Sequence, residues 1–171
     1  MIEFLLDTPL FSTLAPAELA DVVQIMQVQR FRSEQIIVKE GAPGDAWFVT
    51  YEGKAEVIKS NPFTPKRVVA VLESHSCFGE MAVLDGSLRS ASIAALDDVT
   101  VFRFPCGPFQ DLLEEGNLAA YKLVHAMART LCERQRGLNQ RLTDLIEDSE
   151  TDSLGLRSRI GPLLDLSTVS E

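Results

Sequence analysis

Between Gln27 and Pro105 the sequence is built from short segments in which apolar and polar residues alternate. Valine, isoleucine and phenylalanine are enriched in these segments, and turns that contain glycine or proline separate them. This alternation is typical of strands with one buried face, and several short strands at this spacing favour a closed antiparallel roll over a parallel sheet. The predicted strands are Gln29–Arg32, Gln35–Lys39, Ala46–Tyr51, Ala55–Lys59, Arg67–Leu72, Ser90–Ala95 and Thr100–Phe104.

A helix is predicted before the strands, within residues 8–26. Apolar residues recur there at i, i+3, i+4 and i+7, which is typical of an amphipathic helix, and Pro16 suits its first turn. The apolar positions are Leu19, Val22, Val23 and Met26.

The chain becomes helical again after the last strand. A short helix is predicted over Pro108–Glu115, followed by a long helix from Leu118 to about Glu147 with Asn117 as its N-cap. Apolar residues recur along the long helix with alternating spacings of four and three, which indicates a coiled-coil seam with one polar member. So narrow a seam favours a parallel homodimer, and packing of the helix along its own roll is the alternative. The seam residues are Val124, Ala128, Leu131, Gln135, Leu138, Leu142 and Leu145.

The stretch Phe78–Ala95 combines features that suit a bound anion. Gly79 lets the backbone approach closely, and a turn that begins at Glu80 can point N–H groups at an oxyanion. Arg89 adds a fork of donors and is followed by small residues that leave it room. Beside an anion, Glu80 would be costly unless it accepts hydrogen bonds from a neutral group such as a sugar hydroxyl. A plain turn with a surface arginine in a salt bridge is the alternative interpretation.

The string FGEMA followed by RSAS resembles the phosphate-binding cassette of cyclic nucleotide-binding domains, the family of the protein kinase A regulatory subunits and the bacterial catabolite activator protein. The resemblance implies that Arg89 pairs with the cyclic phosphate and that Glu80 holds the ribose 2′-hydroxyl. The residues that would frame them are Phe78, Gly79, Met81, Ala82, Ser90 and Ala91. The strings PLFSTLAPAEL and EGAPGDAWFVTYEGKAEV also resemble this family. The implied fold is α+β: a jelly-roll-like antiparallel β-roll of about eight strands, with an N-terminal helix, a short cassette helix and a long C-terminal dimerisation helix.

The same resemblance assigns the base-binding end of the site. Matching the string MARTL to the long helix of the catabolite activator places Arg134 and Gln135 at base-contacting positions. Glutamine can read the N6 and N7 edge of adenine, whereas arginine can read guanine or stack on either ring. The alternative is that Gln135 sets the register of the dimer and that Arg134 faces solvent. Cyclic AMP is favoured slightly over cyclic GMP, Ser90 does not decide between them, and cyclic di-GMP stays open.

Charge and cysteine content limit the partners. The formal net charge of −9 is the reverse of the basic footprint of nucleic-acid binding, so no direct DNA contact is expected. No apolar run approaches the ~20 residues of a membrane helix, and the N-terminus lacks the features of a signal peptide. Cys77, Cys106 and Cys132 are an odd number at wide spacing, most simply free thiols in a reducing cytoplasm.

Catalysis and metal binding find little support in the sequence. His75 and His125 lack HExxH spacing, and neither a P-loop nor a dinucleotide fingerprint is present, so we expect no enzyme activity and no metal. His75 and Cys77 precede the cassette and could ligate haem iron or zinc, as some relatives of the catabolite activator hold haem. The presence of both Glu80 and Arg89 weighs against that alternative.

The sequence therefore predicts a non-enzymatic cytoplasmic sensor of a cyclic nucleotide over residues 1–147, which signals to an unidentified partner protein by rearrangement of its lid helix. Residues 148–171 are predicted to be a flexible or loosely docked acidic tail, because Gly155, Gly161 and Pro162 should interrupt a helix. This tail is too short for the winged helix-turn-helix that follows the long helix of the catabolite activator. The alternative function is a nucleotide-free β-roll scaffold that dimerises through its long helix.

Overall fold

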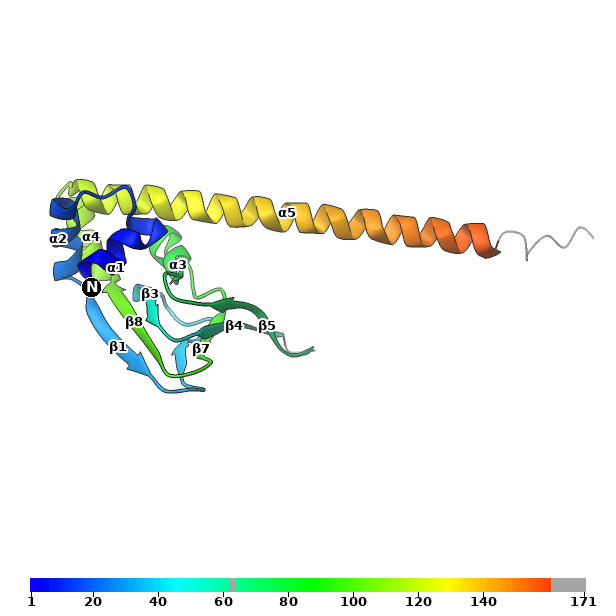
Figure 1. Cartoon of the computed structure of the whole chain (residues 1–171), viewed down its shortest axis with the longest axis horizontal. Helices are drawn as coiled ribbons and strands as arrows, with labels where there is room; N and C mark the ends of the chain where they lie inside the picture. Colours follow the sequence, from blue (N-terminus) through cyan, green and yellow to red (C-terminus); the bar gives the residue numbers. More distant parts are fainter. Residues whose placement is uncertain (62–63, 161–171) are drawn as a thin grey trace, which may run out of the picture. The chain divides into compact units, whose positions relative to one another are not determined.

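The computed structural model describes the backbone of residues 1–61 and 64–160, and the side chains of residues 1–60 and 67–146. Within these residues, eight strands form two four-stranded antiparallel sheets, with the orders β1-β8-β3-β6 and β2-β7-β4-β5 (Figure 1). The strands are β1 Gln27–Phe31, β2 Ile36–Val38, β3 Ala46–Glu52, β4 Ala55–Asn61, β5 Thr64–Leu72, β6 Cys77–Phe78, β7 Ser92–Ala95 and β8 Val99–Pro105. The predicted α+β fold with an antiparallel roll is confirmed.

Strands β3 and β8 separate two hydrophobic cores. Phe104 pairs with Trp47 in the antiparallel register, and both side chains belong to the core on the helical side. The neighbouring Phe48 and Val101 belong to the core inside the roll. Because successive side chains of a strand point to opposite faces, a strand that is covered on both faces has a continuous run of buried residues. This explains why the first five residues of β3 are all buried.

Helices gather at one end of the sheets (Figure 1). α1 Ile2–Asp7, the 3₁₀ helix η1 Pro9–Phe11 and α2 Pro16–Gln24 precede the strands. α4 Cys106–Glu114 and α5 Leu118–Ile160 follow them, and the short α3 Glu80–Asp85 lies between β6 and β7. The predicted helix start at Pro16 is confirmed, but α2 ends before Met26, and α1 and η1 were not predicted.

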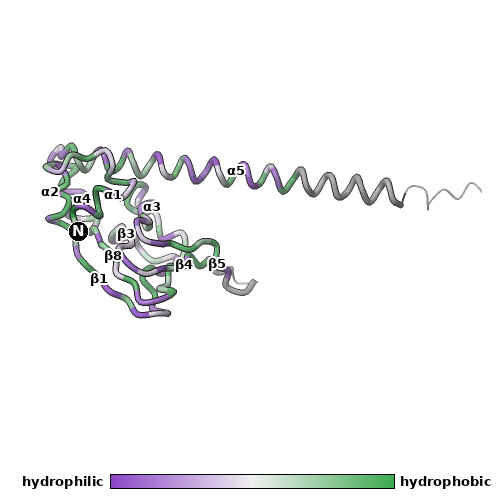
Figure 2. The backbone as a smooth tube through the Cα atoms, viewed as in Figure 1, coloured by the Kyte–Doolittle hydropathy of each residue, from purple (hydrophilic) through white to green (hydrophobic). Residues whose placement is uncertain are grey.

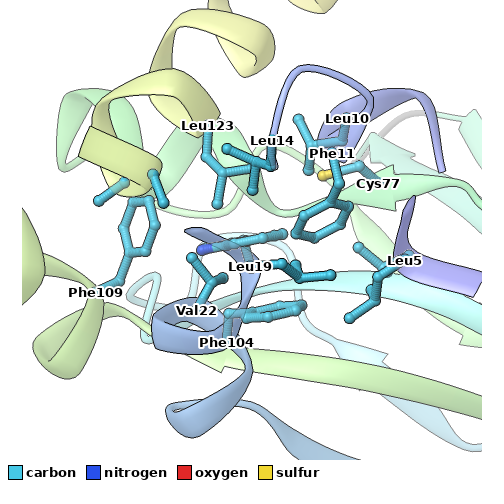
Figure 3. Close-up of a cluster of buried hydrophobic side chains, with 14 of the residues drawn as sticks. Leu5, Leu10, Phe11, Leu14, Leu19, Val22, Cys77, Phe104, Phe109 and Leu123 are labelled. Carbon is cyan, nitrogen blue, oxygen red and sulfur yellow. The ribbon is translucent and has the colours of Figure 1, made fainter. Parts of the chain in front are cut away.

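An aromatic cluster lies between these helices and the sheet (Figure 3). Trp47 and Phe104 stack with their ring centroids 4.0 Å apart, and Phe109 of α4 meets Trp47 edge-on at 5.7 Å. Phe11 of η1 packs at 6.0 Å from Phe104. Leu123, from the first turns of α5, is also fully buried in this cluster. The helices are therefore attached to the roll mainly by apolar burial.

Two details of the fold differ from the sequence-based expectation. β6 has only two residues, too few for an alternation to show in the sequence. The long helix was expected to end near Glu147, and its backbone continues to Ile160. That residues 148–171 form a flexible or loosely docked tail stays a prediction. A single glycine such as Gly155 costs a helix about 1 kcal/mol, which is too little to end it. The rest of the predicted tail, residues 161–171, lies outside the described residues.

The chain divides into two compact units, Met1–Met127 and Ala128–Glu171. Along α5 from Ala128 to Ile146, hydrophobic and hydrophilic residues alternate (Figure 2). Three of the predicted seam residues in this unit, Leu138, Leu142 and Leu145, are more than half exposed. None of the helices in the described part of the chain combines the length and apolar content that crossing a membrane requires.

Candidate functional site

The predicted cassette is a short helix with a left-handed glycine at each end. Gly79 (φ +77°) leads from β6 into α3, and Gly86 (φ +68°) ends that helix. Positive φ is costly for residues that carry a Cβ atom, which explains glycine at both ends. At Gly79 the space is also filled, because an added Cβ would lie 2.7 Å from Nη1 of Arg89. The sequence thus allows the Arg89 guanidinium to lie directly against the start of the cassette.

Arg89 is buried, with only 5% of its surface exposed. Its Nη1 donates a hydrogen bond to the carbonyl oxygen of Gly79 at 2.9 Å, and its Nη2 donates to that of Ala46 at 2.6 Å and to Oδ1 of Asp45 at 3.1 Å. The guanidinium carbon also lies 5.8 Å from the ring centroid of Phe48. These bonds use three of the five N–H groups of a guanidinium. The Nε–H and the second Nη1–H take part in none of these three bonds.

Asp45 connects Arg89 to a second arginine, Arg103 of β8. Its Oδ2 accepts a hydrogen bond from Nη2 of Arg103 at 2.7 Å, while its Oδ1 accepts from Arg89. Partial burial raises the pKa of the Asp45 carboxyl. The hydrogen bond and the charge of Arg103, a hydrogen bond from the backbone of Asp45 and the hydrogen bond from Arg89 outweigh it and hold this pKa below its ordinary value. Asp45 is therefore ionised at neutral pH and balances part of the buried charge. The sequence analysis missed this role, although Asp45 lies in the string EGAPGDAWFVTYEGKAEV.

The other predicted cassette residues lie around α3. Glu80 is its first residue and is only 3% exposed, an unusual burial for a carboxylate. Met81 is exposed, and the Ser90 hydroxyl lies 3.8 Å from its sulfur. Ala82 packs closely on the loop between β2 and β3. A Cβ atom added at Gly44 of this loop would lie only 2.2 Å from the Cβ of Ala82. α3 is therefore held tightly against the β2–β3 loop.

Two further predicted residues complete this side of the site. Phe78 of β6 is buried and stacks on Phe48, with ring centroids 5.1 Å apart. Ala91 is half-buried beside Ser90. The structure thus brings eight of the predicted residues to one segment of the roll, and their contact with a nucleotide stays a prediction.

Arg134 and Gln135, the predicted base-contacting residues, belong to the second unit. Gln135 donates a hydrogen bond from Nε2 to Oδ1 of Asn139 at 3.0 Å, one turn further along α5. Both residues are exposed. Their contact with the base and the role of Gln135 in a dimer seam stay predictions.

His75 contacts the N-terminal helix. Its Nδ1 lies 2.8 Å from the Thr8 hydroxyl, and its ring stacks on Phe4 at 4.0 Å. Because Thr8 donates to the Phe4 carbonyl, its hydroxyl oxygen is left to accept from the imidazole. Among the described residues, no three histidine, cysteine or acidic side chains gather in a way that could hold a metal ion. The contacts of His75 therefore attach α1 to the turn before β6.

The comparisons with known proteins agree with this geometry. The profile of the family described as "Cyclic nucleotide-binding domain" matches residues 28–116, just over half of the chain. The cAMP-dependent protein kinase regulatory subunit of Aspergillus fumigatus is 33% identical over 124 residues, which cover 68% of this chain and 29% of that protein. The chain therefore belongs to the cyclic nucleotide-binding domain family, and it spans less than a third of the length of this relative.

Solved structures show the same fold. The catabolite activator protein of Thermus thermophilus superposes with a TM-score of 0.71 at 27% identity, over 81% of this chain and 63% of that one. The N-terminal domain of a transcriptional regulator from Streptomyces coelicolor A3(2) gives a TM-score of 0.67 at 27% identity, over 79% of this chain and 94% of that one. The predicted family resemblance is confirmed.

Proposed function

We propose that this chain is a non-enzymatic sensor that binds a cyclic nucleotide at the cassette formed by β6, α3 and Arg89. The observation that carries the proposal is the buried Arg89 guanidinium, whose hydrogen bonds to Gly79, Ala46 and Asp45 use three of its five N–H groups. A cyclic phosphate offers two exocyclic oxygens, which suit a guanidinium fork. Family membership supports the same ligand class.

The two buried charged residues, Arg89 and Glu80, would bind different parts of the nucleotide. Arg89 pairs with the phosphate, and the carbonyl oxygens of Gly79 and Ala46 fix the direction of its side chain. The Glu80 carboxyl accepts a hydrogen bond from the ribose 2′-hydroxyl. An acidic protein can bind an anion here because the positive charge is concentrated at one buried group.

Cyclic AMP is the ligand we favour, and cyclic GMP is the second candidate. The relative from Aspergillus fumigatus carries cyclic AMP dependence in its name. In this chain Gln135 would read the adenine edge and Arg134 would stack on the base. Both residues would act from α5, so the ligand would stabilise the state in which this helix covers the base.

We also propose the output of the sensor. The exposed leucines of the second unit form a seam for a parallel homodimer, and rearrangement of the lid helix signals to a partner protein. The free cysteines suit the cytoplasm. A nucleotide-free scaffold that dimerises through α5 is the competing function, and the burial of both Glu80 and Arg89 counts against it.

Calorimetry with cyclic AMP, cyclic GMP and cyclic di-GMP tests the proposal on the wild type, on Arg89→Ala and on a control, Arg30→Ala. Arg30 is an exposed arginine of β1. Loss of a charge-assisted contact costs about 1.5–3 kcal/mol, so Arg89→Ala should bind roughly tenfold to 150-fold more weakly. The control should bind like the wild type. Equal affinities for all three proteins would remove the phosphate role of Arg89, and a wild type without binding would favour the scaffold.

A further inference from the structure

Lys59 of β4 reaches the backbone of the cassette from the neighbouring strand. Its ammonium donates hydrogen bonds to the carbonyl oxygen of Ser90 and to Oε1 of Glu40, each with an N···O distance of 2.5 Å. Ser90 directly follows Arg89, so this contact acts on the main chain next to the buried arginine. Lys59 is itself about half exposed.

Glu40 holds this lysine in place. Its Oε2 accepts a hydrogen bond from the backbone N–H of Ser60 at 3.1 Å, and its own N–H donates to the Ser92 hydroxyl at 3.0 Å. The hydrogen bond from Lys59, followed by that from Ser60, lowers the pKa of the Glu40 carboxyl. Glu40 is therefore charged at neutral pH and fixes the position of the Lys59 ammonium.

The residues that follow Glu40 also hold the backbone of Arg89. The N–H of Arg89 donates to the Ala42 carbonyl, and the Gly41 N–H donates to the Arg89 carbonyl, both at 2.9 Å. The main chain at Arg89 and Ser90 is thus held both by the β2–β3 loop and by Lys59.

We propose that Lys59 and Glu40 are positioning residues for the nucleotide: they set the place of the Arg89 main chain, and so of its guanidinium, without contacting the ligand. This inference rests on the proposed function. A buried donor fork requires an accurate supporting shell, whereas an exposed ion pair contributes little to folding. The pair should therefore influence ligand affinity more than stability.

The chain provides a matched control on the same strand pair. Lys54, just before β4, pairs with Glu73 at 2.7 Å and is 51% exposed, against 53% for Lys59. Its ammonium donates to Oε1 of Glu73, whereas that of Lys59 donates to Glu40 and to the cassette backbone. Lys59→Met and Lys54→Met remove the same charge from similarly exposed lysines, and only Lys59 contacts Ser90. The partner of Lys59, Glu40, is less exposed than Glu73, at 26% against 64%.

Cyclic AMP titrations and backbone hydrogen exchange on the full chain test the inference. Lys59→Met and Glu40→Gln should each bind about threefold to fivefold more weakly, the upper range for an exposed charge pair, and the double variant should be no weaker than either. Lys54→Met should bind like the wild type, and Lys59→Arg should recover most of the affinity. In the absence of nucleotide, the amides of Arg89 and Gly41 should exchange faster in Lys59→Met than in Lys54→Met.

The outcomes separate this inference from the proposed function. Equal affinity of Lys59→Met and wild type, or equal exchange rates in the two lysine variants, would overturn the positioning role alone. An equal loss of affinity in Lys59→Met and Lys54→Met would also overturn it, because charge alone would then explain the effect. A wild type that binds no cyclic nucleotide would overturn both.

Discussion

The two sides of β3 differ in what they bury: apolar side chains on one side and a charged group on the other. On the helical side, Trp47 and Phe104 are fully buried in a cluster of aromatic and aliphatic side chains. On the cassette side, the carbonyl of the preceding residue, Ala46, accepts a hydrogen bond from the buried Arg89. Apolar burial stabilises the first side, whereas the second keeps a charge out of water and holds it with oxygen atoms. Neighbouring residues of one strand therefore serve stability and binding separately.

This division explains why the cassette can hold a buried cation. The Arg89 guanidinium contacts a paired strand, since Ala46 is part of the pairing between β3 and β8. The strand pairing thus fixes the direction of the carbonyl that Arg89 contacts. The rigid apolar side supplies the stability that a buried charge does not, and substitutions on the two sides should differ in kind.

The largest effect on stability is expected on the helical side. Phe104→Ala removes a fully buried ring that stacks on Trp47 at 4.0 Å, and should lower the free energy of unfolding by about 3–5 kcal/mol. Urea unfolding followed by the fluorescence of Trp47, the single tryptophan, measures this loss. The nucleotide affinity of the folded fraction should stay near that of the wild type.

A smaller substitution protects this test from complete unfolding. Phe104→Leu keeps most of the apolar volume and should cost less than Phe104→Ala. If either folded variant loses affinity as strongly as Arg89→Ala, the two sides of β3 are coupled and the division of roles is wrong.

The sequence predicted the sheet better than it predicted the contacts of the site. Alternation identified the longer strands because a half-buried strand needs it, but β6 has only two residues and α1 and η1 are each short. Glu80 and Arg89 were selected through the family resemblance, and both are buried. The partners of Arg89 at Asp45 and Ala46 are more than forty residues away in the sequence, so only the folded sheet brings them together.

The contacts from β4 were missed for a related reason. Nothing in the local pattern distinguishes Lys59, in the second half of β4, from Lys54, directly before that strand. The pairing of β4 with β7 places one of them beside the end of the cassette. Long-range register decides such contacts, and a single sequence does not reveal it.

The next largest effect is expected on the cassette side, where Gly79 and Gly86 form a matched pair for substitution. Gly79→Ala and Gly86→Ala both place a Cβ at positive φ, which costs about 1–2 kcal/mol. Only at Gly79 does the new atom meet a neighbour, the Arg89 guanidinium, at 2.7 Å, while nothing lies within 4 Å at Gly86. We therefore expect similar losses of stability in thermal unfolding, but loss of nucleotide affinity by more than about tenfold for Gly79→Ala alone. Equal affinities of the two variants would show that the guanidinium can move aside without consequence for binding.

The smallest effect concerns the charge pair that links the helices, and it depends on pH. Both carboxylate oxygens of Glu18 in α2 accept hydrogen bonds from Nζ of Lys122 in α5, at 2.6 and 2.8 Å, and Oε2 also accepts from the N–H of Ala15. The bond from Lys122, followed by that from Ala15, lowers the pKa of Glu18 below its ordinary value of 4.5. A carboxyl with a lowered pKa in the folded state stabilises the protein above its ordinary pKa, and this contribution is lost as the pH falls through the folded-state value.

Glu18→Gln should therefore lower the melting temperature slightly at pH 7, and the difference from the wild type should shrink as the pH falls below about 4.5. Thermal unfolding of both proteins between pH 7 and pH 3.5 measures this convergence, and nucleotide affinity at pH 7 should not change. A difference that is constant across this range would mean that the glutamate acts through packing and not through its charge. A loss of nucleotide affinity at pH 7 would instead show that the contact between α2 and α5 affects the cassette. Stability and binding would then not be separate on the two sides of β3.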